Sequence, residues 1–408
     1  MRRVVVTGMG GVCALGDHWE AVERGLRAGR NAVRYMTEWD QHRDLGTRLA
    51  APCDAFAVPA QWTRKQLRSM GRVSQLAVRA SELALADAGI DDAEMMRGGD
   101  LGVACGSCVG STPDVVDFAR MLVDGDSSRV NANTYVRMMP HTAAANVSIF
   151  FGLTGRVIPT SSACTSGSQA IGFAFETIRA GSQEMMLAGG AEELCVTQAK
   201  AFDLLYAASR HNDSPASSPR PYDRERDGLV IGEGASMLVL EDFEHARRRG
   251  ARMLAEIVGF ATNSDGTHVT RPEERTMRKV MELALANARV AASDVGYVNG
   301  HGTATEQGDI AESRATAAVF GARVPISSQK SFLGHTLGAC GAIEAWFSIG
   351  MMNRGWFAPT LNLDEIDPEC APLDYIRGDG RELRTDLVMT NNFAFGGVNT
   401  SLLLRRPP

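Results

Sequence analysis

Short apolar runs alternate with longer stretches of helical periodicity along the whole chain, and this alternation limits the folds open to it. The runs at residues 4–6, 101–104, 185–188, 237–240, 324–327 and 387–390 are expected to be buried strands. Residues 72–88, 166–179 and 275–288 carry apolar side chains at helical spacing. Alternating strands and helices predict an α/β fold with mainly parallel sheets.

The length of the chain predicts two parts that share a core. One hydrophobic core seldom serves 408 residues, and no Pro- or Ser-rich linker divides the sequence. Residues 162–167 and 334–339 each place a chemically active side chain at the expected start of a helix rich in small residues. We therefore expect a duplicated architecture, with one half at residues 1–250 and the other at 251–408.

The composition is that of a soluble globular protein, with 44% hydrophobic and 22% charged residues. A net charge of −6 gives no indication of a nucleic-acid partner. No apolar stretch is long enough for a membrane span, and early glycines interrupt any signal peptide. The eight cysteines are expected to be reduced thiols in a cytoplasm. Cys105 and Cys108 lack a second pair at metal spacing, so no metal site is expected.

Cys164 lies among small residues just before the expected helix 166–179. A thiol at a helix N-terminus is near unpaired N–H groups and the positive end of the helix dipole, which favour the thiolate. Thiolate is the form that attacks a thioester. Taken alone, this cysteine is more often explained as a buried structural residue.

Two of the eight histidines follow expected strands and have a glycine neighbour, namely His301 and His335. Glycine lets a backbone or a ligand approach closely. Either histidine alone is equally well explained as a hydrogen-bonded core residue. Two such histidines together with a cysteine before a helix indicate a nucleophilic active site.

The chain resembles the β-ketoacyl-[acyl carrier protein] synthases I and II from Arg3 to about Leu404. The motifs that carry the resemblance are SACTSG at 162–167, RPYDRERDG at 220–228, HGTAT at 301–305, KSFLGH at 330–335 and NFAFGG at 392–397. The resemblance implies the thiolase fold, with two similar α/β halves in a five-layered αβαβα arrangement, usually a homodimer. It also implies the Cys-His-His type of site. Thiolases fit less well, because no C-terminal Cys-x-Gly follows Cys340.

The resemblance implies a decarboxylative Claisen condensation. Cys164 accepts an acyl chain from the phosphopantetheine thioester of an acyl carrier protein. Malonyl-carrier then loses carbon dioxide, and its enolate attacks the acyl-enzyme to give a 3-ketoacyl-carrier. His301 and His335 donate N–H groups to the enolate oxygen, and the backbone N–H groups of Cys164 and Phe395 hold the tetrahedral intermediate.

Supporting roles come from the same resemblance. Lys330 orients the polar network. Glu344, expected on the same helix as His335, supports Lys330 and in relatives contacts a monovalent cation; no other cofactor is expected. The remaining assignments are Thr303 and Thr305 to the phosphopantetheine arm, Val109 and Phe395 to the acyl pocket, and Phe395 also to a gate. Val109 is equally well explained as a core residue.

An acidic carrier protein needs a basic docking patch. Arg64, Lys65, Arg68 and Arg72 lie at helical spacings, and Arg210 is a further candidate. A solvated helix face explains these charges equally well.

Two departures from the family pattern bear on the substrate. Glu306 and Gln307 follow Thr305, where relatives have proline, and Ala394 replaces a glycine of the gating loop. If that position needs a positive φ, alanine restricts it. These changes leave the expected catalytic set intact but leave the acyl substrate open. The chain is expected to be an elongating synthase of fatty acids or one dedicated to a specialised polyene or polyketide pathway.

Other interpretations remain open at this point. A catalytically inactive partner subunit resembling a chain-length factor is disfavoured by Cys164, and a decarboxylase without condensation is disfavoured for the same reason. The acyl length, the carrier, and the choice between a homodimer and a heterodimer with a ketosynthase-like subunit are not determined by these residues.

Overall fold

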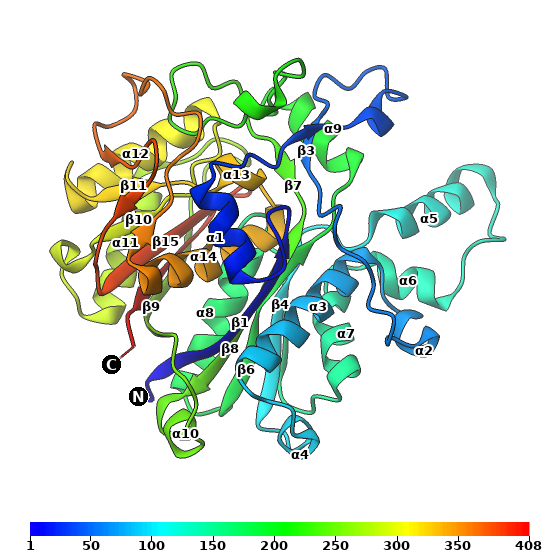
Figure 1. Cartoon of the computed structure of the whole chain (residues 1–408). Helices are drawn as coiled ribbons and strands as arrows, with labels where there is room; N and C mark the ends of the chain where they lie inside the picture. The colour runs from blue at the N-terminus through cyan, green and yellow to red at the C-terminus, as the bar shows by residue number, and fades with distance from the viewer. Residues whose placement is uncertain (408) are drawn as a thin grey trace.

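A computed structural model describes residues 1–407 of the chain. An eleven-stranded mixed sheet runs through it (Figure 1), in the order β13-β11-β10-β15-β16-β9-β1-β8-β6-β4-β5. The N-terminal strands are β1 (Val4–Cys13), β8 (Gly234–Asp242), β6 (Met185–Glu192), β4 (Leu101–Gly106) and β5 (Val157–Thr160). The C-terminal strands are β9 (Ala255–Ser264), β16 (Val398–Arg405), β15 (Leu387–Ala394), β10 (Tyr297–Asn299), β11 (Pro325–Ser327) and β13 (Asp374–Tyr375).

The two halves repeat one strand pattern. In the first, β1 pairs antiparallel with β8, β8 antiparallel with β6, and β6-β4-β5 are parallel. In the second, β9-β16-β15 are antiparallel and β15-β10-β11 are parallel. The expected duplication is present, and β1 pairs with β9 at the junction. The expectation of mainly parallel sheets is wrong, because local apolar runs do not reveal strand direction.

Successive side chains of each strand point to opposite faces of the sheet, so helices can pack on both faces and form five layers. Met186, Ala188 and Leu240 point into a central core with the helices between the two half-sheets, whereas Met185 and Leu187 point into an outer core. The central helices are α8 (Ser166–Arg179) and α14 (Cys340–Arg354). The outer ones are α3 (Arg72–Asp87) and α7 (Thr142–Phe151) on one side, with α11 (Glu274–Ala288) and α12 (Glu306–Phe320) on the other. The five-layered thiolase arrangement is confirmed.

Smaller elements lie around these layers. The helices are α1 (Trp19–Arg27), α2 (Arg64–Leu67), α4 (Ala93–Arg97), α5 (Thr112–Asp124), α6 (Ala132–Met138), α9 (Val196–Leu204), α10 (Phe243–Arg248) and α13 (Lys330–Leu333). The short strands are β2 (Arg34–Tyr35), β3 (Leu49–Ala51), β7 (Ile231–Gly232), β12 (Trp356–Phe357) and β14 (Arg381–Glu382). Within residues 1–407, no helix combines the length and the apolar character needed to cross a membrane.

The sequence-based helices agree closely with the structure, since α8 has the expected bounds and α3 and α11 differ by one residue at one end. All eight cysteines are free thiols. The division of the chain at residue 250 stays a prediction.

Glycines in β1 explain why this strand extends beyond its apolar start. A Cβ on Gly10 would lie 2.4 Å from the backbone N of Ala84, and one on Gly8 would lie 2.3 Å from the carbonyl oxygen of Ala84. The glycines let α3 pack directly on the strand backbone, so they belong to the sheet rather than to a turn.

Gly10→Ala should destabilise the protein by about 1–3 kcal/mol, because the added methyl group overlaps backbone atoms of α3 that cannot move alone. The measurement is the free energy of unfolding from guanidinium denaturation. Gly25→Ala is the control: Gly25 lies in α1, and the nearest neighbour of its added Cβ is the side-chain end of Leu15 at 3.3 Å. An unfolding free energy for Gly10→Ala equal to that of the wild type would contradict the close packing.

Candidate active site

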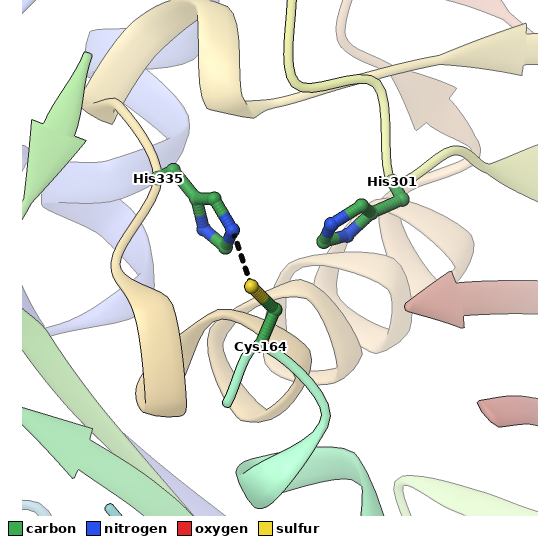
Figure 2. A group of neighbouring side chains, drawn as sticks. All are labelled: Cys164, His301 and His335. Carbon is green, nitrogen blue, oxygen red and sulfur yellow. Dashed lines mark hydrogen bonds between the residues drawn. The ribbon is translucent and has the colours of Figure 1, made fainter. Parts of the chain in front are cut away.

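Three side chains from distant parts of the chain meet where the two halves join (Figure 2). Cys164 lies two residues before α8, His301 follows β10, and His335 lies between α13 and α14. His335 Nε2 is 3.0 Å from the Sγ of Cys164. The two imidazole rings are nearly perpendicular, with centroids 5.1 Å apart. Both rings face the thiol, so the sequence-predicted trio is brought together.

Each of the three catalytic loops contains a non-glycine residue with left-handed backbone. Ala163 has φ 51°, Ala304 has φ 65° and Leu337 has φ 47°. Such conformations cost free energy for residues with a Cβ and persist where the surrounding structure imposes them. Ala394 lies in β15, and the adjacent positive φ angles fall on Gly396 and Gly397. The alanine of the gating loop therefore meets no backbone restriction.

Hydrogen bonds determine which nitrogen of each histidine carries the proton. The backbone N–H of Leu337 donates to Nδ1 of His335, over 3.2 Å. Nδ1 of His301 accepts from the Nζ of Lys330, at 3.1 Å, and lies 3.4 Å from Nδ2 of Asn392. Because both Nδ1 atoms are acceptors, each ring carries its proton on Nε2. Two neutral donors are thus available beside Cys164.

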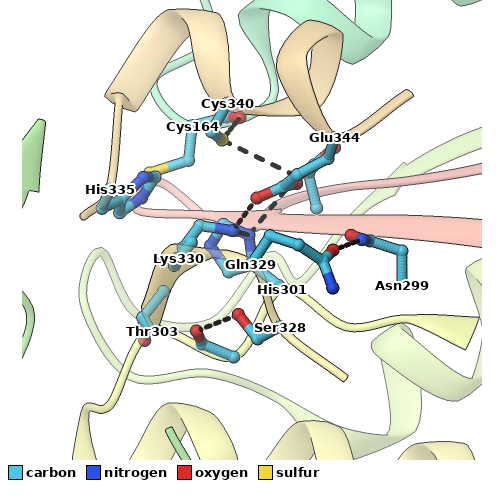
Figure 3. Close-up of polar contacts among 12 residues, drawn as sticks. Cys164, Asn299, His301, Thr303, Ser328, Gln329, Lys330, His335, Cys340 and Glu344 are labelled. Atoms are coloured by element: carbon cyan, nitrogen blue, oxygen red, sulfur yellow. Dashed lines mark hydrogen bonds and ion pairs between the residues drawn. The ribbon is translucent and has the colours of Figure 1, made fainter. Parts of the chain in front are cut away.

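A buried ion pair lies behind the histidines (Figure 3). Lys330 donates to Glu344, whose other oxygen accepts from Nδ2 of Asn392 at 2.7 Å. Burial lowers the pKa of both His301 and His335 well below its ordinary value, and the charge of Lys330 lowers it further. Burial acts to lower the pKa of Lys330 as well, but Glu344 raises it above the ordinary value. The lysine therefore stays charged while the imidazoles stay neutral.

The placement of Glu344 relative to His335 differs from the expected one. Glu344 lies on α14, but His335 lies five residues before that helix begins. A short 3-10 helix, Leu337–Ala339, runs directly into α14, and its first amide, that of Leu337, donates to Nδ1 of His335. Together with burial and the charge of Lys330, this helix start keeps the imidazole neutral.

The thiol of Cys164 also differs from expectation. Burial raises its pKa to about 11, although Lys330 and the backbone N–H groups of Phe395 and Cys164 act in the opposite direction. Proximity to α8 was expected to favour the thiolate, but the cost of burying the charge is larger. Those same two N–H groups are the predicted oxyanion donors, and they lie beside the sulfur.

A cavity of about 330 Å³ leads to Cys164 and is lined by the predicted arm and gate residues Thr303, Thr305 and Phe395. The two threonine hydroxyls are 2.9 Å apart. Val109 is not part of this wall; its N–H donates to Glu192. Its assignment to an acyl pocket stays a prediction.

Three buried carboxylates that support these loops were not identified from the sequence. Glu192 accepts from the N–H groups of Cys108, Val109 and Gly338, which joins the two halves. Glu312 accepts from the N–H groups of His301 and Gly302, and Asp309 accepts from that of Thr303. In the sequence, the signal that could have identified these carboxylates is an acidic residue within an otherwise apolar or glycine-rich segment.

The predicted docking cations fall into two groups. Arg64, Lys65 and Arg68 are exposed on or just after α2, without an ion pair among residues 1–407. Arg72 and Arg210 are instead held by acidic side chains: Arg72 by the buried Glu233, and Arg210 by Asp203 at 2.7 Å. Arg72 is therefore not a free docking cation.

Comparison with known proteins gives matches over the whole chain. Family models described as the beta-ketoacyl synthase N-terminal and C-terminal domains match residues 1–246 and 254–364. The 3-oxoacyl-[acyl-carrier-protein] synthase 2 of Rhizobium meliloti is 37% identical, over 100% of this chain and 99% of its own. A solved beta-ketoacyl synthase from Burkholderia phymatum is 60% identical with a TM-score of 0.99, covering both chains completely. The ishigamide ketosynthase/chain length factor structure is 30% identical with a TM-score of 0.92, again over both full chains.

Alkylation of Cys164 should become faster by about tenfold per pH unit between pH 7 and 9, because the thiolate is a minor species below a pKa of about 11. The measurement is the rate of iodoacetamide modification by peptide mass spectrometry. The Cys164→Ser variant is the control, because any modification that it still shows comes from the other cysteines. A rate that levels off below pH 8 would show that the thiolate already dominates near neutral pH and would contradict the effect of burial.

Proposed function

Because the chain belongs to the β-ketoacyl synthase family and is a condensing acyltransferase, we propose that Cys164, His301 and His335 divide the reaction between them. Cys164 carries the acyl chain. The two histidines act on the malonyl group. The observation that supports this division is that both imidazoles are held neutral, with Nε2–H directed to the space beside the thiol.

In the first half-reaction, an acyl thioester on the phosphopantetheine arm of an acyl carrier protein reaches Cys164 through the cavity. The sulfur of Cys164 attacks the carbonyl carbon, and the resulting oxyanion accepts from the N–H groups of Cys164 and Phe395. When the intermediate collapses, the carrier thiolate leaves and takes up the proton released by the cysteine. The acyl chain then remains as a thioester of Cys164.

In the second half-reaction, malonyl-carrier occupies the same cavity. Its carboxylate leaves as carbon dioxide, and the electron pair of the broken bond forms an enolate whose oxygen accepts from Nε2–H of His301 and His335. The enolate carbon attacks the acyl thioester and expels the thiolate of Cys164. The product is a 3-ketoacyl chain two carbons longer, attached to the carrier.

We propose that this chemistry needs no cofactor, because acyl transfer and enolate stabilisation both use groups of the chain itself. The carboxylate of Glu344 does not fit the role of a ligand to the monovalent cation of relatives. Both carboxylate oxygens of Glu344 are engaged, one by Lys330 and one by Asn392. Among the buried side-chain oxygens beside them in the described part of the chain, the Oδ1 of Asn392 is the one without a partner.

The eight free thiols support a cytoplasmic location.

We propose that a second protein chain covers the edge of the sheet at β5. This strand ends the sheet order and exposes Val157. Leu122, Val123 and Tyr135 are exposed on α5 and α6, which lie between β4 and β5 in the chain. Unpaired edges and grouped apolar side chains mark interfaces. A second copy is the proposed partner, and a ketosynthase-like subunit is the alternative, as in the ishigamide ketosynthase/chain length factor structure.

Sedimentation equilibrium should give twice the mass of one chain for the purified wild type, and the mass of one chain for Leu122→Asp/Val123→Asp, because buried carboxylates oppose the interface. Leu204→Asp, at an exposed leucine on α9, should leave the mass doubled. A wild-type protein that sediments as a single chain, or a double variant that stays dimeric, would contradict the self-association.

The division of labour predicts opposite defects in two variants. Cys164→Ala should lose acylation but retain malonyl-carrier decarboxylation, because both histidines remain. His301→Ala should retain acylation but decarboxylate about 10²–10³-fold more slowly, as expected for loss of one oxyanion donor. The measurements are intact mass after incubation with acyl-carrier, and carbon dioxide release from malonyl-carrier.

The matched histidine variant, His335→Ala, should have the same decarboxylation defect as His301→Ala. Condensation by Cys164→Ala at the wild-type rate, or normal decarboxylation by both histidine variants, would overturn the assignment.

A further inference from the structure

Helix α9 ends in three exposed apolar side chains at the mouth of the active-site cavity. Leu204 is 64% exposed, Leu205 47% and Tyr206 85%. Leu205 and Tyr206 line the cavity together with Phe202, and Cys164 is part of the same wall. Single exposed apolar residues are common on soluble proteins, but a contiguous group beside a cavity marks an interaction surface.

The backbone at Tyr206 gives a second, independent sign of function. The N–H of Tyr206 donates to the carbonyl of Asp203 at 3.1 Å, and that of Ala207 donates to the carbonyl of Phe202 at 2.9 Å. This is a Schellman motif, in which the left-handed position is usually glycine. Tyr206 occupies it with φ 54°. A bulky aromatic residue in this conformation is strained, and strain of this kind collects at functional sites.

The charge around the three residues shows what kind of surface they offer. The guanidinium of Arg210 lies 5.8 Å from the ring centre of Tyr206 and is bound through two nitrogens to Asp203, at 3.1 and 2.7 Å. Arg210 shares this carboxylate with Lys200, so it is paired with Asp203 rather than free beside the tyrosine. On another part of the rim, one acidic and one basic side chain are exposed, Glu306 and Arg271. This side of the mouth offers apolar contact, in contrast to the unpaired cations on α2.

We propose that Leu204, Leu205 and Tyr206 form an apolar docking lip for the protein part of the acyl carrier. The inference rests on the proposed function, in which a phosphopantetheine arm passes through this cavity to Cys164. Because the arm is attached to the carrier, the carrier surface around the attachment point must lie against the rim. The matching patch on the carrier is apolar, and the docking lip selects carriers that have one.

Tyr206→Gly separates docking from folding, because glycine suits the left-handed position. The experiment compares Cys164 acylation by an acyl-carrier thioester and by the same acyl chain on N-acetylcysteamine, which has no protein part. The ratio of the two kcat/KM values should fall by about tenfold, the typical effect of removing an aromatic interface residue. The melting temperature should equal or exceed that of the wild type. Tyr206→Asn, also tolerated in this conformation, should give the same ratio.

Arg289→Gly is the matched control. Arg289 has φ 57° at the C-terminal end of α11 and lines a different cavity. The substitution relieves the same backbone strain away from the mouth, so the kcat/KM ratio should stay at the wild-type value.

Three results would overturn the docking lip. An unchanged ratio in both Tyr206 variants would show that the carrier does not contact this residue. An equal loss with both thioesters would place Tyr206 in the channel for the arm. A change in sedimenting mass would make the surface a self-interface. Failure of the wild type to react with either thioester would instead contradict the proposed function itself.

Discussion

The buried ion pair of Lys330 and Glu344 is the interaction on which the rest of the site depends. Removing two charges from water costs several kcal/mol per ion, so such a pair seldom adds stability. Here it sets the state of the histidines. Lys330 faces Nδ1 of His301, and Glu344 holds the Asn392 amide beside the same atom. The charges stay behind the imidazoles, and neutral N–H donors face the reacting atoms.

The nucleophile and the histidines come from different halves of the chain, so the chemistry depends on how closely those halves approach. Small residues permit this approach: a Cβ on Gly167 of α8 would lie 2.9 Å from the carbonyl of Gly338. The carboxylate of Glu192 also joins the halves, because it accepts hydrogen bonds from the backbone N–H groups of Cys108 and Gly338. The central layer of α8 and α14 therefore serves as the rigid support on which the thiol and His335 are held.

The sequence pattern predicted those elements whose structure depends mainly on residues close to them in the chain. Helix 166–179 could be placed because its apolar spacing and its small residues are both visible in the sequence. Strands β9 and β16 were missed, because polar residues end β9 and follow Val398 at the start of β16. Each is placed by pairing with strands on both sides, which the local pattern does not show. The donors to Glu192 lie 84 and 146 residues away, and Arg72 meets Glu233 across 161 residues. The proton position on His335 depends on one backbone N–H, which no side-chain motif encodes.

The most direct test of the central claim is intact-protein mass spectrometry of the wild type, mixed first with acyl-carrier thioesters of increasing length and unsaturation and then with malonyl-carrier. We predict an acyl adduct on Cys164 that disappears as a 3-ketoacyl-carrier two carbons longer forms, and the preferred adduct will identify the pathway. A folded protein that takes up no acyl chain from any donor, or an adduct that persists after malonyl-carrier is added, would contradict the account.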